Sequence, residues 1–276
     1  MADTPGLCGE DMRLCPIASG SSGNSIYVGT ANTHILVDTG ISKKRIEEGL
    51  NGLELAGHDI DAILITHEHS DHIQGLGVFT RKYPVPIYGT EKTLMAIQMS
   101  KGLGHISPEL FHCIEADHEF MVGDIEVNPM KISHDAADPV AYTFKNGDCN
   151  MAVATDMGKY DDYIIRRLTG MDALLLESNH DIRMLQVGPY PYQLKQRILS
   201  DNGHLSNESC GRLLCQIAHD DLQHIFLGHL SHENNMPELA YETVRMEIEM
   251  GDCKYSAGDF DLKVAKRSEP SAVIEI

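Results

Sequence analysis

Residues 62–72 carry the most informative pattern in the chain: Ala62-Ile63-Leu64-Ile65-Thr66-His67-Glu68-His69-Ser70-Asp71-His72. The apolar run Ala62–Ile65 predicts a buried strand, and the polar cluster begins where that strand ends. Three histidines and an aspartate within six residues are costly to bury unless they bind something. Neutral imidazole and carboxylate are the usual ligands of zinc, manganese or iron. The segment therefore predicts a metal site at the edge of a sheet, where α/β proteins usually place active sites.

Strand-like and helix-like segments alternate along the 276 residues, which predicts an α/β layered architecture. The expected strands are Ser25–Val28, His34–Asp38, Ala62–Thr66, Ile87–Gly89, Ile125–Ile132, Ala141–Phe144, Met151–Thr155, Ala173–Glu177 and His224–Leu227. The expected helices are Lys43–Leu50, Glu91–Lys101, Tyr160–Leu168, Tyr192–Leu199, Asn207–Ile217 and Pro237–Met250. The run 61–66 resembles the run 172–177, so two similar halves fit a sandwich of two sheets with helices outside. No linker divides the chain, and we expect one domain over residues 1–276.

Composition restricts the class of protein. The formal net charge is −19, which repels nucleic acid at long range and weighs against a broad basic binding face. No apolar run is long enough to span a membrane, and the first residues lack the apolar core of a secretory signal. The seven cysteines show no CxxC spacing, so we expect reduced thiols and a cytoplasmic location.

Four further segments complete a recognisable set. They are Val37-Asp38-Thr39-Gly40, His134 after the strand-like Val127–Ile132, Ala154-Thr155-Asp156-Met157-Gly158, and Leu227-Gly228-His229-Leu230. In this order, with residues 66–72, they resemble the motifs of the metallo-β-lactamase superfamily from about residue 14 to residue 265. The resemblance implies a four-layer αββα sandwich, in which two mixed β-sheets carry helices on their outer faces.

The resemblance also implies two divalent metal ions as cofactors. By motif, His67, His69 and His134 would bind the first metal, and Asp71, His72 and His229 the second. Asp156 would bridge the metals, and Asp38 would orient the ligand loop. Such a pair of metals activates a bridging hydroxide for hydrolysis. Zinc, manganese and iron all accept these ligands, so the sequence does not identify the metal.

Two motif positions at which branches of the superfamily differ restrict the type of reaction. His69 stands where flavodiiron oxidoreductases have glutamate, which disfavours a redox function. Asp156 stands at the bridging position, where zinc β-lactamases have cysteine, so the pattern favours hydrolysis of phosphodiesters, thioesters or lactones.

Four segments resemble one branch of the superfamily, the YycJ (WalJ, VicX) family. They are Ala18–Ser25, His134–Pro139, Glu177–Asp181 and Gly203–Asn207. The resemblance implies a phosphodiesterase, in particular a DNA exonuclease. A small-molecule hydrolase of cyclic phosphodiesters, thioesters or lactones is the alternative, favoured by the acidic charge and the lack of an inserted nucleic-acid domain. A third interpretation is a regulatory protein that keeps metals only for stability. Replaced ligand residues in the motifs would have supported it, and none of the motif ligands is replaced.

Candidate contacts to the substrate come from loops. The loop Ser19–Ser25 suits a backbone nest for phosphate, although a flexible hairpin turn fits equally well. Its candidates are Ser21, Ser22 and Asn24; Asn179 and Ser206 are the others. The segment Arg183–Ser200 combines three cations with two tyrosines and no acid, which suits either a single nucleic-acid strand or an ordinary surface.

The candidate catalytic residues are Asp38, Asp71, His180 and His204. A departing alkoxide needs a proton, and the metal-binding histidines cannot supply it. His204, in a glycine-flanked turn before a helix, is the first candidate for this proton donor, and His180 is the second.

Overall fold

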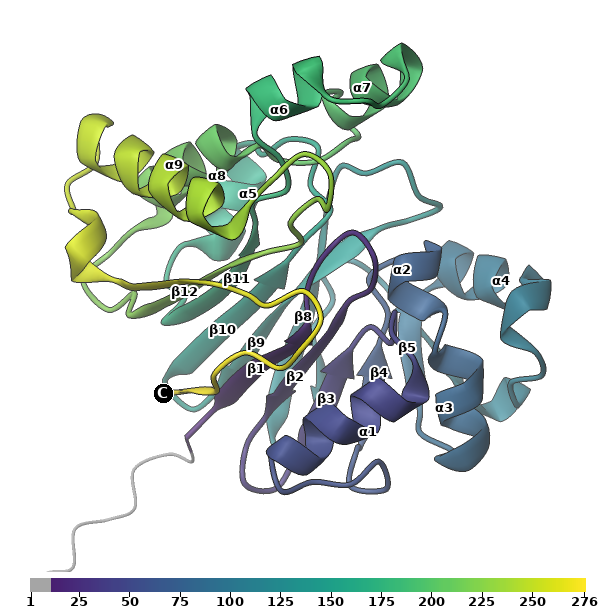
Figure 1. Ribbon diagram of the computed structural model, residues 1–276. Helices are drawn as coiled ribbons and strands as arrows, with labels where there is room; N and C mark the ends of the chain where they lie inside the picture. Colours follow the sequence, from purple (N-terminus) through teal and green to yellow (C-terminus); the bar gives the residue numbers. More distant parts are fainter. Residues whose placement is uncertain (1–10) are drawn as a thin grey trace, which may run out of the picture.

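The computed structural model describes residues 11–276, in which two seven-stranded sheets lie face to face (Figure 1). The first sheet has the order β14-β1-β2-β3-β4-β5-β6. Its strands are β1 (Arg13–Ala18), β2 (Ser25–Gly29), β3 (His34–Val37), β4 (Ala62–Leu64), β5 (Ile87–Thr90), β6 (Phe111–Ile114) and β14 (Ile274–Glu275). Strands β3 to β6 run parallel, whereas β14, β1, β2 and β3 pair antiparallel.

The second sheet has the same division into a parallel and an antiparallel half. Its order is β13-β12-β11-β10-β9-β8-β7, with β10 to β13 parallel and β7 to β10 antiparallel. The strands are β7 (Phe120–Val122), β8 (Ile125–Lys131), β9 (Val140–Asn146), β10 (Cys149–Ala154), β11 (Ala173–Glu177), β12 (His224–Gly228) and β13 (Asp261–Val264). Because parallel strands end at a common edge, each sheet can gather several loop residues there.

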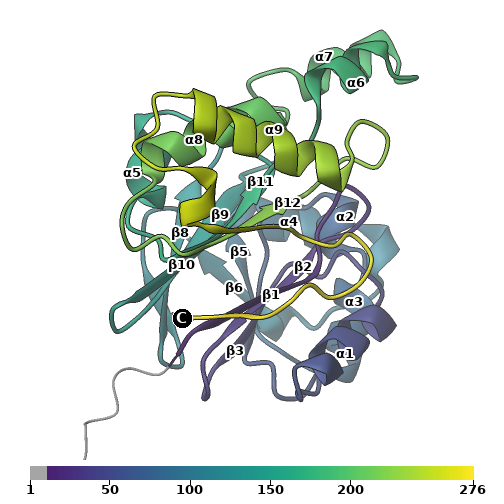
Figure 2. The same ribbon diagram turned by 60° about the vertical axis from the view of Figure 1, so that its left-hand side comes forward.

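The helices cover the two outer faces (Figure 2). On the first sheet they are α1 (Lys43–Gly52), α2 (Ser70–Ile73), α3 (Leu76–Lys82) and α4 (Glu91–Met99). On the second sheet they are α5 (Asp162–Leu168), α8 (Asn207–Ile217) and α9 (Pro237–Met250). The short helices α6 (Ile182–Val187) and α7 (Tyr192–Ile198) project from the molecule beyond this layer. Three 3₁₀ turns cover Lys101–Leu103, Pro108–Leu110 and Ala257–Asp259.

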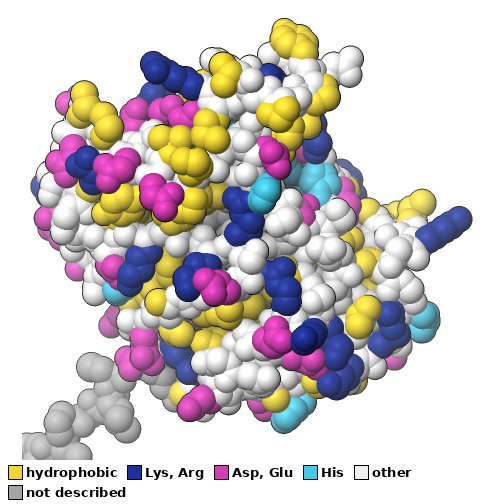
Figure 3. Space-filling model, viewed as in Figure 1, with side chains coloured by type: hydrophobic (Ala, Val, Ile, Leu, Met, Phe, Trp, Pro, Cys, Tyr) yellow, Lys and Arg dark blue, Asp and Glu magenta, His cyan; other side chains and the backbone are white. Residues whose placement is uncertain are grey.

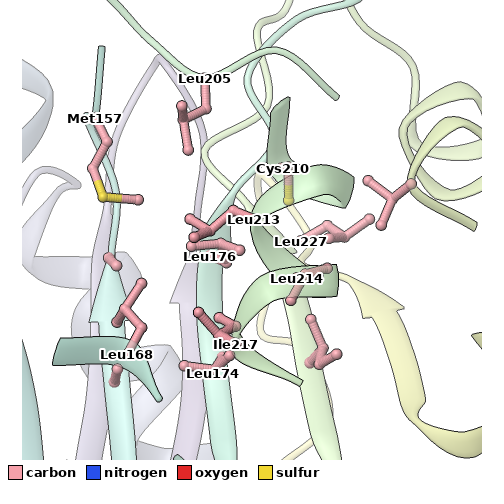
Figure 4. Close-up of a cluster of buried hydrophobic side chains, with 14 of the residues drawn as sticks. Met157, Leu168, Leu174, Leu176, Leu205, Cys210, Leu213, Leu214, Ile217 and Leu227 are labelled. Carbon is pink, nitrogen blue, oxygen red and sulfur yellow. The ribbon is translucent and has the colours of Figure 1, made fainter. Parts of the chain in front are cut away.

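Three apolar clusters hold the four layers together. One lies between the sheets, one between the first sheet and α1, α3 and α4, and one between the second sheet and α5, α8 and α9. Figure 4 shows the last, in which α8 contributes Cys210, Leu213, Leu214 and Ile217. That spacing places all four side chains on one face of the helix, toward Leu174 and Leu176 of β11. The expected four-layer αββα sandwich is confirmed.

All nine expected strands and all six expected helices are present, with ends shifted by a few residues. The sequence reasoning missed β1, where Pro16 argues against a strand; the pairing with β2 shifts register next to that proline. It also missed the short edge strands and the helices α2, α3 and α6, which are too short for a clear period. The six described cysteines are free thiols. None of the helices in residues 11–276 has the length and apolar character of a membrane span, and the expectation of no secretory signal falls partly on residues 1–10, outside the described part.

Candidate metal centre

The predicted ligands lie where parallel strands of both sheets end. Asp38 follows β3, Asp156 follows β10, and His229 follows β12 directly. All three have a positive φ, at 60°, 61° and 55°. Residues other than glycine rarely adopt this left-handed backbone conformation, because their Cβ crowds the backbone. The backbone accepts this local cost at three positions, and each turns a carboxylate or imidazole toward the same place.

His67, His69 and His134 form a compact triad. Their ring centroids are 4.5 to 5.1 Å apart, and His69 Nδ1 lies 3.3 Å from His134 Nε2. His134 is fixed through Nδ1, which lies 3.0 Å from the Gly203 carbonyl oxygen. Burial, and then the neighbouring imidazoles, hold the pKa of His67 well below its usual value. Burial likewise lowers the pKa of His134, so both of these imidazoles favour the neutral form, which is the form that binds metal.

Asp71, His72 and His229 form a second group on the other side of the cluster. Asp71 Oδ2 lies 3.4 Å from His72 Nε2 and 3.5 Å from His229 Nε2. The close turn that carries Asp71 requires Gly40, because a Cβ there would lie 1.6 Å from the Asp71 carbonyl oxygen. The motif Val37-Asp38-Thr39-Gly40 therefore has a steric function as well as a chemical one.

Asp156 joins the two groups. Its Oδ2 lies 3.3 Å from His72 Nε2, and its Oδ1 lies 3.7 Å from His134 Nε2. The side chain is buried, and burial would raise its pKa, but the surrounding imidazoles of His229, His72 and His134 lower it. Asp156 is thus a buried anion shared by both groups.

Three buried atoms of the cluster have no hydrogen-bond partner among the described residues: His67 Nε2, Asp156 Oδ2 and His229 Nε2. Leaving such groups unpaired costs roughly 1–3 kcal/mol each. The donor atoms lie within 4.8 Å of one another in sets that include His67–His69–His134 and Asp71–His72–His229. A divalent cation requires several imidazole and carboxylate atoms that are close enough together to surround one ion and are not already paired. These residues meet both conditions, so they fit bound metal.

Asp38 supports the first sheet's side of the cluster. Its carboxylate accepts hydrogen bonds from the Thr66 amide at 2.9 Å and the Thr66 hydroxyl at 2.8 Å, and lies 2.7 Å from His72 Nδ1. Burial alone would lower the pKa of His72, but the charges of Asp156, Asp38 and Asp71 raise it well above its usual value. Among the candidate ligands Asp38 contacts His72, and from this position its carboxylate can orient that imidazole.

Glu177 supports the second sheet's side, and the sequence reasoning gave it no role. The fully buried carboxylate accepts from the amides of Met157 at 2.7 Å and Leu205 at 3.1 Å. It also lies 2.8 Å from His204 Nδ1 and 3.0 Å from His229 Nδ1. Burial would raise the pKa of Glu177, but these two imidazoles hold it well below its usual range. An acid at the end of a buried strand, in the run that resembles 61–66, was the available signal.

His204 and His180 differ in access. The His204 side chain is 19% exposed, stands 5.1 Å from the His134 ring and lines a cavity of about 250 Å³. His180 is buried, neither of its ring nitrogens has a partner in the described part, and burial lowers its pKa to about 4. Both histidines lie near Glu177, but His204 is the one that reaches the cavity.

The five expected substrate contacts separate into two groups. Ser21 and Asn179 line the same cavity as His204, and Ser22 is exposed beside Ser21. Asn24 is buried: its Oδ1 accepts from the Gly20 amide at 2.9 Å, and its Nδ2 lies 3.1 Å from His72 Nε2. Ser206 caps α8, accepting from the Ser209 amide at 3.2 Å. The cavity therefore brings together Ser21, Asn179 and His204, whereas Asn24 and Ser206 hold loops.

Two mixed sheets with a histidine and carboxylate cluster at their shared edge define the metallo-β-lactamase class. A family model described as a β-lactamase superfamily domain matches residues 33–225. Exodeoxyribonuclease YycJ of Bacillus anthracis is 44% identical over 238 residues, which cover 86% of this chain and 89% of that protein. Exodeoxyribonuclease WalJ of Streptococcus pneumoniae serotype 2 strain D39 is 43% identical over 236 residues, 86% of this chain and 88% of that protein.

The crystal structure of the metallo-β-lactamase fold protein YhfI from Bacillus subtilis is similar in fold alone. Its TM-score is 0.70 at 16% identity, and the match covers 97% of this chain and 100% of that chain. The chain belongs to the β-lactamase superfamily, in the family of the YycJ and WalJ proteins.

Proposed function

We propose that this chain is a metal-dependent phosphodiesterase that degrades DNA as an exonuclease. The observation that carries the proposal is the identity of 44% with an exodeoxyribonuclease over 86% of the chain, together with a complete set of seven metal-binding candidates in one cluster. The six described cysteines are free thiols, which fits a cytoplasmic location.

The donor sets suggest how the residues divide. His67, His69 and His134 would hold one metal, Asp71, His72 and His229 a second, and Asp156 would touch both. Two divalent metals bound there would lower the pKa of a water molecule between them and neutralise the oxygens of a phosphodiester. Zinc, manganese and iron are all compatible with these ligands.

His204 is suited to protonate the departing oxygen of the substrate. Its Nδ1 faces the Glu177 carboxylate, which can only accept, so Nδ1 carries a proton and donates a hydrogen bond to Glu177. Its ring lines the cavity beside the cluster, where a proton on Nε2 would be available to the substrate. His180 is the second candidate for this proton donor, and its burial makes it the less accessible one.

Ser21, Ser22 and Asn179 would contact the phosphates of the substrate. Ser21 and Asn179 line the cavity, and Ser22 is exposed on the same loop as Ser21. Asn24 and Ser206 would act on the substrate only indirectly, because Asn24 holds the loop of Gly20 and Ser206 caps α8.

One preparation, loaded with zinc, manganese or iron in turn, tests the proposal. It is assayed against single-stranded DNA, bis(p-nitrophenyl) phosphate, a thioester and nitrocefin. We expect activity on DNA and on the phosphodiester, none on nitrocefin, and two metals per chain by elemental analysis. At most one metal per chain would reject the dinuclear centre, and hydrolysis of nitrocefin without phosphodiesterase activity would reject the function.

The net charge of −19 favours a second candidate, a hydrolase of small cyclic phosphodiesters, thioesters or lactones. The same assays separate the two functions. Activity on bis(p-nitrophenyl) phosphate or the thioester, with none on DNA, would favour the small substrate.

A further inference from the structure

Two arginines near the cavity, Arg267 and Arg45, belong neither to the metal centre nor to the three apolar clusters. Arg267 follows β13, and Arg45 lies in the first turn of α1. The Arg267 guanidinium donates to the Ser231 carbonyl at 2.8 Å, and that of Arg45 to the Arg267 carbonyl at 3.4 Å. Neither forms an ion pair within residues 11–276. In a chain of formal charge −19, two guanidinium groups without an anionic partner are candidates for binding an anion from outside.

Arg267 is fixed at the rim of the cavity of about 250 Å³. It donates to the Ser231 carbonyl, and Ser231 lines that cavity. Its aliphatic stem packs on Gly20, where a Cβ would lie 2.9 Å from Arg267 Cγ. Gly20 in turn pairs with Leu230, the residue after the metal-binding candidate His229. An anion at this place would therefore meet a guanidinium that is already positioned.

The guanidinium of Arg267 has lost water without gaining a negative partner. Burial lowers the pKa of Arg267, and this effect exceeds the opposite effect of the Glu233 carboxylate. Glu233 lies 2.8 Å from His232 Nδ1, and Glu269, further along the same loop as Arg267, pairs with Lys266 at 3.0 Å. The acids around Arg267 thus have other partners, and its charge is left for a ligand.

Arg45 carries a charge that its helix does not need. α1 begins with three consecutive cations, and its first turn has no acid. The partial positive charge of a helix N-terminus disfavours cations there. The first two cations are each paired with a glutamate one turn later, at 2.9 and 3.6 Å. The residue one turn after Arg45 is Gly49, which has no side chain to pair with it.

The two arginines extend the surface of the cavity toward α1. Arg45 reaches the backbone of Arg267, although 222 residues separate them. The loop that carries Ser21 of the cavity also touches the segment before α1, because a Cβ on Gly23 would lie 2.5 Å from the Gly40 carbonyl oxygen. On the face shown in Figure 3, Lys and Arg side chains extend from the surface histidines down to α1, with acidic side chains beside them.

We propose that Arg267 and Arg45 bind the DNA backbone, at phosphates next to the one that lies at the metal centre. This inference rests on the proposed function and adds to it a binding site outside the cavity. The planar guanidinium of Arg267 can donate two parallel hydrogen bonds to one phosphate, and Arg45 adds a second charge further out. Because backbone phosphates are the same in every sequence, the site would give affinity without sequence preference.

The test uses the metal-loaded enzyme and two substrates. One is a DNA oligonucleotide, as single strand or duplex, whichever wild type degrades faster, and the other is bis(p-nitrophenyl) phosphate, which has no neighbouring phosphate. In Arg267→Gln, the ratio of kcat/KM for the oligonucleotide to that for the small diester should fall about 10- to 100-fold, the usual contribution of a hydrogen bond to a charged group. In Arg45→Gln it should fall about 2- to 5-fold, as for a more exposed ion pair.

The matched control is Arg166→Gln on α5, which should keep the ratio. Arg166 is exposed, and α5 runs from the end of β10 near the cluster to the start of β11 at the opposite edge. The variant therefore makes the same change of charge away from the cavity.

The salt dependence identifies a phosphate contact. Each lost contact should make the plot of log kcat/KM for the oligonucleotide against log salt concentration less steep by about 1. The double variant of Arg267→Gln and Arg45→Gln should therefore lose about 2 from this slope. Arg267→Lys keeps the charge without the planar group, so it should keep the slope while the ratio falls.

Each contrary result has its own meaning. If wild type degrades the oligonucleotide and both arginine variants keep the ratio and the slope, the inference is wrong and the proposed function stands. If Arg267→Gln loses activity equally on both substrates, Arg267 only holds the loop of Ser231, and the inference is again wrong. If wild type hydrolyses the small diester and no DNA, both the inference and the proposed exonuclease are wrong.

Discussion

The parallel pair β3–β4 of the first sheet and the pair β10–β11 of the second are alike where their second strands begin. Asp61, before β4, donates its amide to the His34 carbonyl at 2.8 Å and accepts from the His34 amide at 2.8 Å. Asp172, before β11, donates to the Asn150 carbonyl at 2.8 Å and accepts from its amide at 2.7 Å. The likeness of the runs 61–66 and 172–177 is therefore a likeness of structure.

At the ends of these strands the two pairs differ. In the first sheet the buried carboxylate, Asp38, follows β3 and binds the Thr66 amide beyond β4. In the second sheet it is Glu177, at the end of β11, and it binds the Met157 amide beyond β10. Asp38 holds one imidazole, whereas Glu177 holds both His229 and His204. The first pair thus only builds the metal centre, and the second also directs a histidine into the cavity.

Asp156→Asn should have the largest effect, because Asp156 is the residue shared by both halves. An amide of nearly the same shape cannot supply the negative charge, and the loss of several kcal/mol of stabilisation corresponds to at least about a thousandfold in kcat. Elemental analysis should find fewer metals than in wild type. The melting temperature should match that of metal-free wild type; a parallel loss of fold and activity would make Asp156 structural.

Glu177→Gln should come next, because it disturbs metal binding and proton donation together. The amide group of glutamine would oppose the N–H groups that now meet Glu177. Metal affinity should fall about 10- to 100-fold. The rate on a dinucleotide should also fall relative to the rate on a p-nitrophenyl ester. The leaving group of the dinucleotide is an alkoxide that needs a proton, whereas the leaving group of the ester needs none.

His204→Ala isolates the second of these effects and serves as the reference for Glu177→Gln. Its rate ratio should fall by about 10²–10⁴, the usual contribution of a positioned acid, while its metal content stays at the wild-type value. Equal losses on both substrates would exclude His204 from proton donation, and the same two assays on His180→Ala would then decide on His180.

Asp38→Asn should weaken metal binding without changing the ratio of the rates on the dinucleotide and the p-nitrophenyl ester. It loses the anion that fixes His72, so metal affinity should fall about 10- to 100-fold. The dinucleotide-to-ester ratio should stay at its wild-type value, since Asp38 makes no contact with His204 in the described structure. A ratio that falls as in Glu177→Gln would remove the distinction between the two halves.

The layers of the fold and the cluster of metal-binding candidates were predictable from sequence for a physical reason. Buried strands are short apolar runs, and ligands such as His67 and Asp71 follow such a run directly, so a local pattern marks both. His134, Asp156 and His229 needed the order of family motifs, because nothing local distinguishes them from other histidines and acids. The structure brings these residues together as the motifs implied.

Other features were not predictable, because they depend on distant contacts. Glu177 reads as the end of an apolar strand, and only the fold brings His204 and His229 to it from 27 and 52 residues away. Asn24 and Ser206 look like loop residues free to bind a substrate, yet the fold uses one to hold Gly20 and the other to cap α8. The positive φ of His229 likewise has no signal in its sequence, since only a few per cent of residues other than glycine adopt that conformation and no neighbouring residue marks this one.

The smallest effect should come from the two aspartates that the halves share. Asp61→Ala and Asp172→Ala each remove one side-chain hydrogen bond to the backbone of the neighbouring strand, at 2.8 Å and 2.7 Å. One such bond contributes about 0.5–1.5 kcal/mol, so each variant should lose a few degrees of melting temperature. Both lie at the ends of the strands opposite to the cluster, so kcat and metal content should stay within about twofold of wild type. Equal thermal shifts with full activity would support a shared scaffold whose halves differ only where the catalytic loops begin. A loss of metal in either variant would show that this end of the strand pair also positions the ligands, and the comparison would then fail.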